Sequence, residues 1–437
     1  MNIDSLICGR WVIPVEPAGI VHDDYAIAVA DGKILELLPT PAALDKYQAA
    51  EVRQLDNHAL IPGLINTHTH ASMTLFRGIA DDLPLMEWLN EHIWPAEQKW
   101  ISPEFVEDGS RLAIAEMLRG GTTCFNDMYF FPDLTAETAV EAGMRAVIGL
   151  IMVDFPTAWA RDPEEYLEKG EHVHDRFKHS PLIQTAFAPH APYTVSDGPL
   201  QRIGTIAEEL DVQIHMHVHE TETEISQSVE QYGKRPLARL HELGLVSNRL
   251  VAVHMTQLNQ EEIELAAKFG VHVVHCPESN LKLASGYCPL AELLKSGINV
   301  ATGTDGAASN NDLDMIGEMR TTALLAKGVA RDPSAVPADT ALAMATINGA
   351  RALAIDSITG SLIAGKEADI VAIDLSALET QPLYDPVSQI VYSSSRNQVT
   401  DVWIAGKQLL NNRELTTINE EQVRQKAKYW QDKLREA

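Results

Sequence analysis

The sequence predicts an α/β protein in which a (β/α)₈ barrel carries a small β domain formed from both termini. In the middle of the chain, short apolar runs alternate with amphipathic stretches of helical periodicity, a pattern typical of a TIM barrel. Both ends consist instead of short strands and turns. We therefore expect the barrel over residues 59–359, and a composite terminal domain with a C-terminal helix over residues 1–58 and 360–437. A doubly wound open sheet is the alternative arrangement of the same elements.

Local patterns predict the individual elements. Residues 25–30 and 33–38 flank an Asp31-Gly32 turn, which predicts a β-hairpin, and residues 368–373 and 399–404 are strand-like near the other end. The predicted barrel strands span residues 60–68, 122–126, 145–153, 182–188, 212–217, 250–254, 271–275 and 298–302. The helices predicted between them include residues 103–119, 200–210 and 260–269, the last of which is closed by Gly270.

Composition excludes several classes of function. Acidic residues outnumber Lys and Arg by 61 to 34, so binding to a nucleic-acid backbone is disfavoured. No apolar stretch is long enough to span a membrane, and the first residues lack the pattern of a signal peptide. The cysteines show no C-x-x-C spacing, which indicates buried thiols in a reducing compartment. We therefore expect a cytoplasmic protein without nucleic-acid or membrane partners.

Histidines and acids follow the predicted strands at one end of the barrel, where barrel enzymes place their chemistry. These residues are His68, His70, His190, His217, Glu220, His254 and Asp305. His68 and His70 are two apart on a strand, so both imidazoles point the same way and can reach one metal ion. In isolation such a pair could be two surface histidines. Here it ends an apolar strand, and a third imidazole and a carboxylate from other strands would complete a site suited to Zn²⁺.

The run from Leu60 to His70, the His217-x-x-Glu220 pair, His254 and the Thr304-Asp305-Gly306 segment resemble, in this order, the signature of the amidohydrolase superfamily. Residues 360–369 resemble the return of that family's chain to its terminal β domain. The resemblance implies a barrel with a flanking β-sandwich and one metal ion per chain. That ion is usually zinc, with Fe²⁺ or Mn²⁺ as alternatives. The implied metal ligands are His68, His70, His217 and Asp305.

Within this superfamily the sequence is most similar to the 5-methylthioadenosine/S-adenosylhomocysteine deaminases. The similarity lies in residues 88–97, 188–193 and 276–283. It implies that Glu97 binds the ribose of a nucleoside and that His190 contacts the substrate. Trp88 either packs on the substrate or is a core residue. Arginines after the third strand contact the far end of the substrate in some family members, and Arg161 is the residue of this chain that could do so.

The chemistry of deamination suggests roles for the remaining residues. A carboxylate must move protons between the nucleophile, the ring and the leaving amine, and Glu220 is the candidate. Its alternative role is that of an acid at the start of a helix over residues 221–232. Asp305 can bind the metal and accept a proton, and Glu220 and Asp305 also face the substrate. His254 can hydrogen-bond the nucleophile. No lysine follows the fourth strand to bridge two metals, since His190 stands there, which favours one metal.

Other histidines have less certain positions in the sequence pattern. His215 alternates with His217 one layer deeper and is expected to pack inside the barrel. His219 either supports the site from behind or turns outward, and His275 could line the pocket.

The sequence thus predicts an enzyme that hydrolytically deaminates a small-molecule nucleoside. The substrates considered are 5'-methylthioadenosine, S-adenosylhomocysteine and adenosine, and the products are the inosine analogue and ammonia. One alternative is the same chemistry on another ring, as in guanine deaminase or triazine dechlorination, and another is a metal-free scaffold protein. The sequence does not rank the substrates or fix the oligomeric state, and a homo-oligomer is compatible with it.

Overall fold

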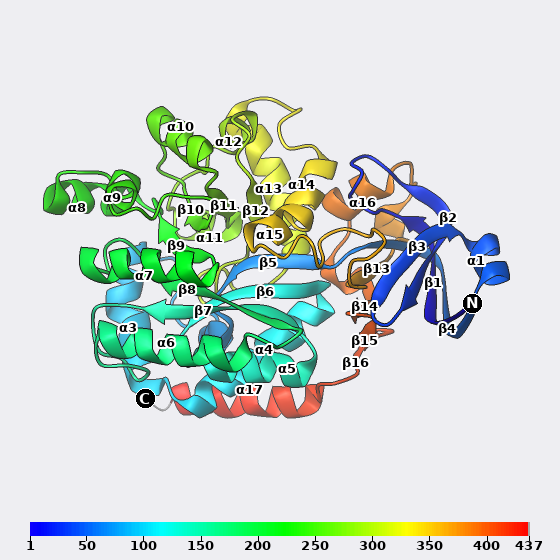
Figure 1. The fold of residues 1–437 in the computed structure, drawn as a ribbon, viewed down its shortest axis with the longest axis horizontal. Coiled ribbons are helices and arrows are strands. Elements are labelled where there is room, and N and C mark those ends of the chain that lie inside the picture. The colour runs from blue at the N-terminus through cyan, green and yellow to red at the C-terminus, as the bar shows by residue number, and fades with distance from the viewer. Residues whose placement is uncertain (436–437) are drawn as a thin grey trace.

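The computed structural model describes residues 1–435 and consists of a barrel of parallel strands beside a separate mixed sheet (Figure 1). The eight barrel strands pair in chain order, and the last returns beside the first, where the Asp305 N–H donates to the His68 carbonyl (3.0 Å). The barrel strands are β5 (Leu64–Thr69), β6 (Thr122–Tyr129), β7 (Arg145–Met152), β8 (Ile183–Pro189), β9 (Ile214–Val218), β10 (Leu250–His254), β11 (His272–His275) and β12 (Val300–Thr302). The predicted fold class is confirmed.

The first predicted strand is the one that differs most from the structure. The apolar run over residues 60–68 divides into the end of β4 (Gln48–Pro62), which belongs to the terminal sheet, and β5 of the barrel. Gly63 separates them, and its N–H donates to the carbonyl of Asp369 (3.0 Å). The chain therefore leaves one sheet and enters the other within a single apolar segment.

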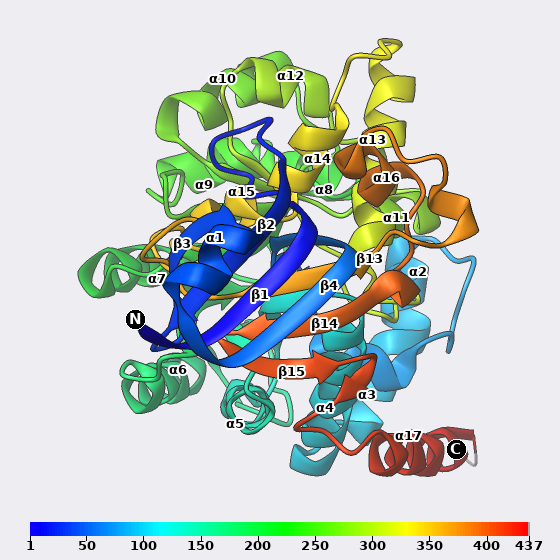
Figure 2. The ribbon, with the colours of Figure 1, turned by 90° about the vertical axis from the view of Figure 1, so that its right-hand side faces the viewer.

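The terminal sheet joins the two ends of the chain (Figure 2). Its strand order is β16-β15-β14-β13-β4-β1-β2-β3, and β13 pairs antiparallel with β4. The predicted hairpin is confirmed, with Ala30 opposite Lys33. The remaining strands of this sheet are β1 (Asn2–Val12), β2 (His22–Ala30), β3 (Lys33–Pro39), β13 (Ile370–Asp374), β14 (Val399–Ile404), β15 (Lys407–Asn411) and β16 (Glu414–Leu415).

Helices cover the outside of the barrel (Figure 1). Two match the predicted bounds, and α7 begins three residues before the predicted start. The longer barrel helices are α4 (Pro103–Arg119), α5 (Pro132–Ala142), α6 (Pro163–Phe177), α7 (Asp197–Leu210), α8 (Glu222–Tyr232), α10 (Gln260–Phe269) and α13 (Met315–Ala330). The short α helices are α1 (Thr40–Lys46), α2 (Leu85–Glu87), α3 (Trp94–Trp100), α9 (Pro236–Glu242), α11 (Pro277–Lys282), α12 (Leu290–Lys295), α14 (Ala338–Met344), α15 (Ile347–Ala352) and α16 (Pro386–Tyr392). The other short helical turns are η1 (Ala71–Phe76), η2 (Trp88–Ile93), η3 (Leu378–Thr380) and η4 (Arg396–Gln398).

The C-terminal helix α17 (Glu420–Arg435) packs along the barrel helix α4. The Trp430 indole N–H donates to a carboxylate oxygen of Asp108 (2.9 Å), and the Trp430 ring lies edge-on to Phe105, with centroids 5.1 Å apart. This contact buries the tryptophan against the barrel. The exact domain boundaries at residues 58 and 360 stay a prediction.

Two predictions from composition can be compared with the structure. All four cysteines, Cys8, Cys124, Cys276 and Cys288, are buried free thiols. Among residues 1–435, no helix combines the length and the apolar character needed to cross a membrane.

Candidate active site

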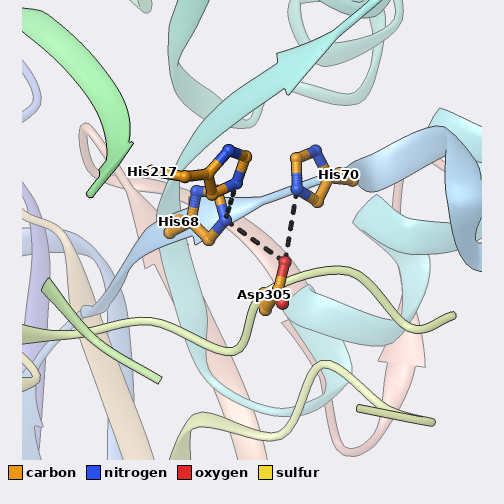
Figure 3. Close-up of side chains that lie close together, drawn as sticks. All are labelled: His68, His70, His217 and Asp305. Atoms are coloured by element: carbon orange, nitrogen blue, oxygen red, sulfur yellow. Dashed lines mark hydrogen bonds and ion pairs between the residues drawn. The ribbon is translucent and has the colours of Figure 1, made fainter. Parts of the chain in front are cut away.

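Four predicted ligands meet at the carboxyl ends of the barrel strands (Figure 3). One ligand atom from each of His68, His70, His217 and Asp305 lies within 4.8 Å of all the others. Asp305 Oδ1 is 3.2 Å from His68 Nε2 and 3.3 Å from His70 Nε2, and the Nε2 atoms of His68 and His217 are 3.1 Å apart. The structure therefore brings together the donor set that the sequence predicted.

Backbone geometry explains why these side chains converge. His68 lies near the end of β5, His70 directly follows that strand, and His217 lies near the end of β9. Asp305 follows β12 with a positive φ of 65°, a strained conformation that is common at functional sites. Gly303 lets β12 approach β5, because a Cβ at this position would lie 2.7 Å from the His68 nitrogen. The close approach places the Asp305 carboxylate beside both His68 and His70.

Hydrogen bonds on the far side of each imidazole aim its Nε2 atom into the cluster. His70 Nδ1 donates to the Met128 carbonyl (2.6 Å), and His217 Nδ1 donates to the His190 carbonyl (2.7 Å). His68 Nδ1 lies 2.8 Å from His215 Nε2. With Nδ1 protonated, the Nε2 lone pairs and the carboxylate oxygen all point at one another, an arrangement that a cation stabilises. The residues present thus fit a divalent metal ion.

The electrostatics of the cluster support the same conclusion. Burial lowers the pKa of His68 to about 4 and that of His217 well below its ordinary value, so both are neutral, the form that binds metals. Although burial alone would raise it, the neighbouring His68 and His70 rings hold the pKa of Asp305 well below its ordinary value. Ser279 and Ser309 also donate to Asp305 Oδ2, each at 2.7 Å. The aspartate is therefore an oriented carboxylate.

Two more predicted residues adjoin the cluster. Glu220 Oε2 is 3.8 Å from His254 Nε2, and His254 Nδ1 is 2.9 Å from Asn280 Oδ1. Glu220 is only 5% exposed, and burial raises its pKa. A carboxyl group with a raised pKa beside a cluster of metal-binding side chains is suited to taking up and releasing protons.

A cavity of about 740 Å³ opens over the cluster. Its lining includes every predicted catalytic and substrate-contacting residue: Trp88, Glu97, His190, Glu220, His254 and Asp305. Glu97 Oε1 accepts a hydrogen bond from the Tyr129 hydroxyl (2.7 Å), and burial raises the pKa of Glu97 to about 7. Trp88 lines the cavity and also packs in a hydrophobic cluster, so both of its predicted alternatives describe part of its environment.

The remaining histidines of the sequence prediction lie in three different environments. His215 is fully buried against His68, as expected for a deeper layer. His219 has a φ of 56°, so the strand alternation ends at Val218, and its Nε2 accepts the Leu237 N–H (3.0 Å) away from the cluster. His275 is buried and lies outside the cavity lining.

Arg161 also lies outside the cavity lining. Its side chain is 79% exposed and pairs with Glu165 (3.0 Å). It does not line the pocket that holds the predicted substrate-contacting residues.

The sequence prediction missed two residues of the site. Tyr129, the partner of Glu97, ends β6, which runs three residues beyond the predicted strand. Glu224 accepts hydrogen bonds from the backbone N–H groups of His219 (2.9 Å) and Glu220 (2.7 Å) and so fixes the segment that carries Glu220. An acid at the third position of a helix whose N-cap is Thr221 could have indicated this role.

Comparison with known proteins identifies the family. Residues 59–409 match the model of the amidohydrolase family. The chain is 50% identical over 431 residues to a 5-methylthioadenosine/S-adenosylhomocysteine deaminase of Saccharophagus degradans, covering 99% of this chain and 97% of that protein. The corresponding protein of Teredinibacter turnerae is 50% identical over 433 residues, covering 99% and 98%.

A solved structure is similar to this chain over its whole length. The crystal structure of an adenosine deaminase from Xanthomonas campestris with bound zinc is 54% identical, with a TM-score of 0.99, and the match covers 100% of this chain and 99% of that one. The predicted resemblance is confirmed: the chain belongs to the amidohydrolase family, together with relatives that are 5-methylthioadenosine/S-adenosylhomocysteine deaminases.

Proposed function

We propose that this protein is a zinc-dependent aminohydrolase that converts 5'-methylthioadenosine, S-adenosylhomocysteine or adenosine to the inosine analogue and ammonia. The observation that carries the proposal is the convergence of three Nε2 atoms and one carboxylate oxygen at the floor of a large cavity that also contains Glu97. Relatives and a zinc-containing structure at 50–54% identity support the same assignment.

The proposed metal site takes one ion per chain, held by His68, His70, His217 and Asp305. Three imidazoles and a carboxylate are a donor set typical of zinc. When bound, zinc lowers the pKa of water to about 7, which makes hydroxide available near neutral pH. The native ion could also be Fe²⁺ or Mn²⁺, and metal analysis of the purified protein distinguishes them.

The residues around the ion have separate proposed roles. Glu220 takes a proton from the nucleophile and delivers it toward the ring nitrogen and the leaving amine. Asp305 orients the attacking water and can share its proton. His254, held by Asn280, hydrogen-bonds the nucleophile. His190 contacts the base from the end of β8, where Thr194 Oγ1 lies 3.0 Å from its Nδ1.

Glu97 favours a nucleoside over a free base or a triazine. Its partly buried carboxylate accepts a hydrogen bond from Tyr129 and faces the cavity, where ribose hydroxyls would supply further donors. A bare ring offers no hydroxyl groups to compensate for burial of this acid.

The test is ammonia release from a panel of purine nucleosides, free bases and triazines, with metal content measured on the same sample. We expect turnover of adenine nucleosides and none of the free bases or triazines. Turnover of guanine or a triazine without turnover of nucleosides would refute the assignment.

A further inference from the structure

The location of the nucleoside's 5' end follows from the two polar ends of the cavity, and this step rests on the proposed function. The reacting carbon of the base must face the four proposed metal ligands, and the ribose must face Glu97 on α3. Ile93 and Trp94 lie one helical turn before Glu97, on the same face. The Trp94 ring faces Phe155 of the segment after β7, with centroids 6.3 Å apart. The 5' substituent of a bound nucleoside would therefore lie between these two segments.

This 5' subsite, formed by Leu89, Ile93, Trp94, Val153, Phe155 and Pro156, is apolar. The whole cavity is lined by acids, histidines and uncharged residues, and neither Lys nor Arg is among its lining residues within 1–435. An adjoining hollow shares Trp94, Phe155 and Tyr193 with the cavity. The charged residues that it adds, Asp154, Glu224 and Glu230, are all acidic.

The nearest cations of the segment after β7 are engaged elsewhere. Arg161 and Lys169 both pair with Glu165, at 3.0 Å each, and neither lines the cavity or the hollow. In the 5' subsite, the carboxylate of a zwitterionic α-amino acid would lose its hydration without gaining a positive partner, since the acidic side chains nearby can pair only with its ammonium group. A methylthio group would instead place its sulfur against aromatic rings, a favourable contact.

We propose that the 5' subsite selects adenine nucleosides whose 5' substituent is small and uncharged, such as methylthio, over those that end in an α-amino acid, such as S-adenosylhomocysteine. Phe155 and Trp94 are the specificity-determining residues, and Arg161 has no part in recognition.

The experiment compares kcat/KM for 5'-methylthioadenosine, adenosine and S-adenosylhomocysteine on the zinc-loaded protein. We expect 5'-methylthioadenosine to exceed S-adenosylhomocysteine by at least about tenfold, because the uncompensated carboxylate lacks charge-assisted hydrogen bonds. Phe155→Arg should narrow this ratio about tenfold by supplying a cation. Phe155 is partly exposed, at 40%, so the fold should tolerate the change. Phe155→Leu, the uncharged control, removes only the aromatic contact and should narrow the ratio less than Phe155→Arg, and Arg161→Ala should leave the ratio unchanged.

The possible outcomes distinguish a failure of the 5' subsite inference from a failure of the proposed function. Equal or faster turnover of S-adenosylhomocysteine by the wild type overturns the inference, as does a selective loss of its turnover in Arg161→Ala. Absence of ammonia from all three nucleosides refutes the proposed function instead. In that case calorimetric binding of the same compounds still tests the subsite, because equal affinity for both 5' substituents would overturn it.

Discussion

Replacing Glu220 by glutamine separates proton transfer from metal binding. Glu220 is buried at 5% exposure, and its carboxylate contacts Ser285 Oγ at 3.5 Å and His254 Nε2 at 3.8 Å. Glutamine keeps the volume and the acceptor for Ser285 but cannot exchange a proton. Proton transfer by a positioned side chain contributes about 10²–10⁴-fold, which corresponds to ~2.7–5.4 kcal/mol in activation free energy. We therefore expect kcat of Glu220→Gln to fall by at least about 100-fold.

The assay is steady-state deamination of 5'-methylthioadenosine followed by ultraviolet absorbance, with zinc content measured in parallel. Zinc content and KM should change little, because Glu220 is not among the four clustered ligands. The matched control is Glu222→Gln, an exposed acid in the first turn of α8, which should leave kcat unchanged. If Glu220→Gln behaves like this control, Glu220 is only an acid at a helix start, and Asp305 or His254 must move the proton.

Variants at three further positions test other parts of the site. Glu97→Ala should lower kcat/KM for nucleosides about ten- to a hundredfold at unchanged zinc content, through lost hydrogen bonds to the ribose; an unchanged value would remove the main support for a nucleoside substrate. Because burial raises the pKa of Glu97 to about 7, the wild-type kcat/KM should decline as the pH falls below that value and Glu97 is protonated, and Glu97→Gln should move this decline to lower pH. His217→Ala should lose both zinc and turnover, and zinc retained at full stoichiometry would exclude His217 as a ligand. Glu224→Gln should lower both Tm and kcat, since one of two backbone N–H groups loses its acceptor at a typical cost of about 1–3 kcal/mol; a loss of Tm with normal kcat would show that Glu224 only stabilises the fold.

Local patterns predicted the barrel well because its buried strands are continuous apolar runs with polar residues at one end. The transition at Gly63 could not be found this way. Residues on both sides of it are apolar, and what separates β4 from β5 is a hydrogen bond to Asp369, more than 300 residues away. Packing of α17 on α4 likewise depends on a contact between Trp430 and Asp108 that no local pattern contains.

The site was predictable where one motif fixes geometry and less so where it depends on contacts between strands. The spacing of His68 and His70 on one strand already predicted that both bind the same metal ion. The pairing of Tyr129 with Glu97 joins β6 to α3, so the strand pattern alone did not indicate it. The side chain of His219 does not follow the alternation of β9, because its backbone adopts a positive φ. The alternating pattern of the sequence does not predict this conformation.

Titration of the metal-depleted protein with zinc tests the central claim most directly. Deamination of 5'-methylthioadenosine should be absent at the start, rise linearly, and reach its plateau at one equivalent of zinc per chain. This result follows from a single cluster in which His68, His70, His217 and Asp305 each offer one ligand atom. Full activity before zinc is added, or a plateau at two equivalents, would contradict a mechanism based on one metal ion.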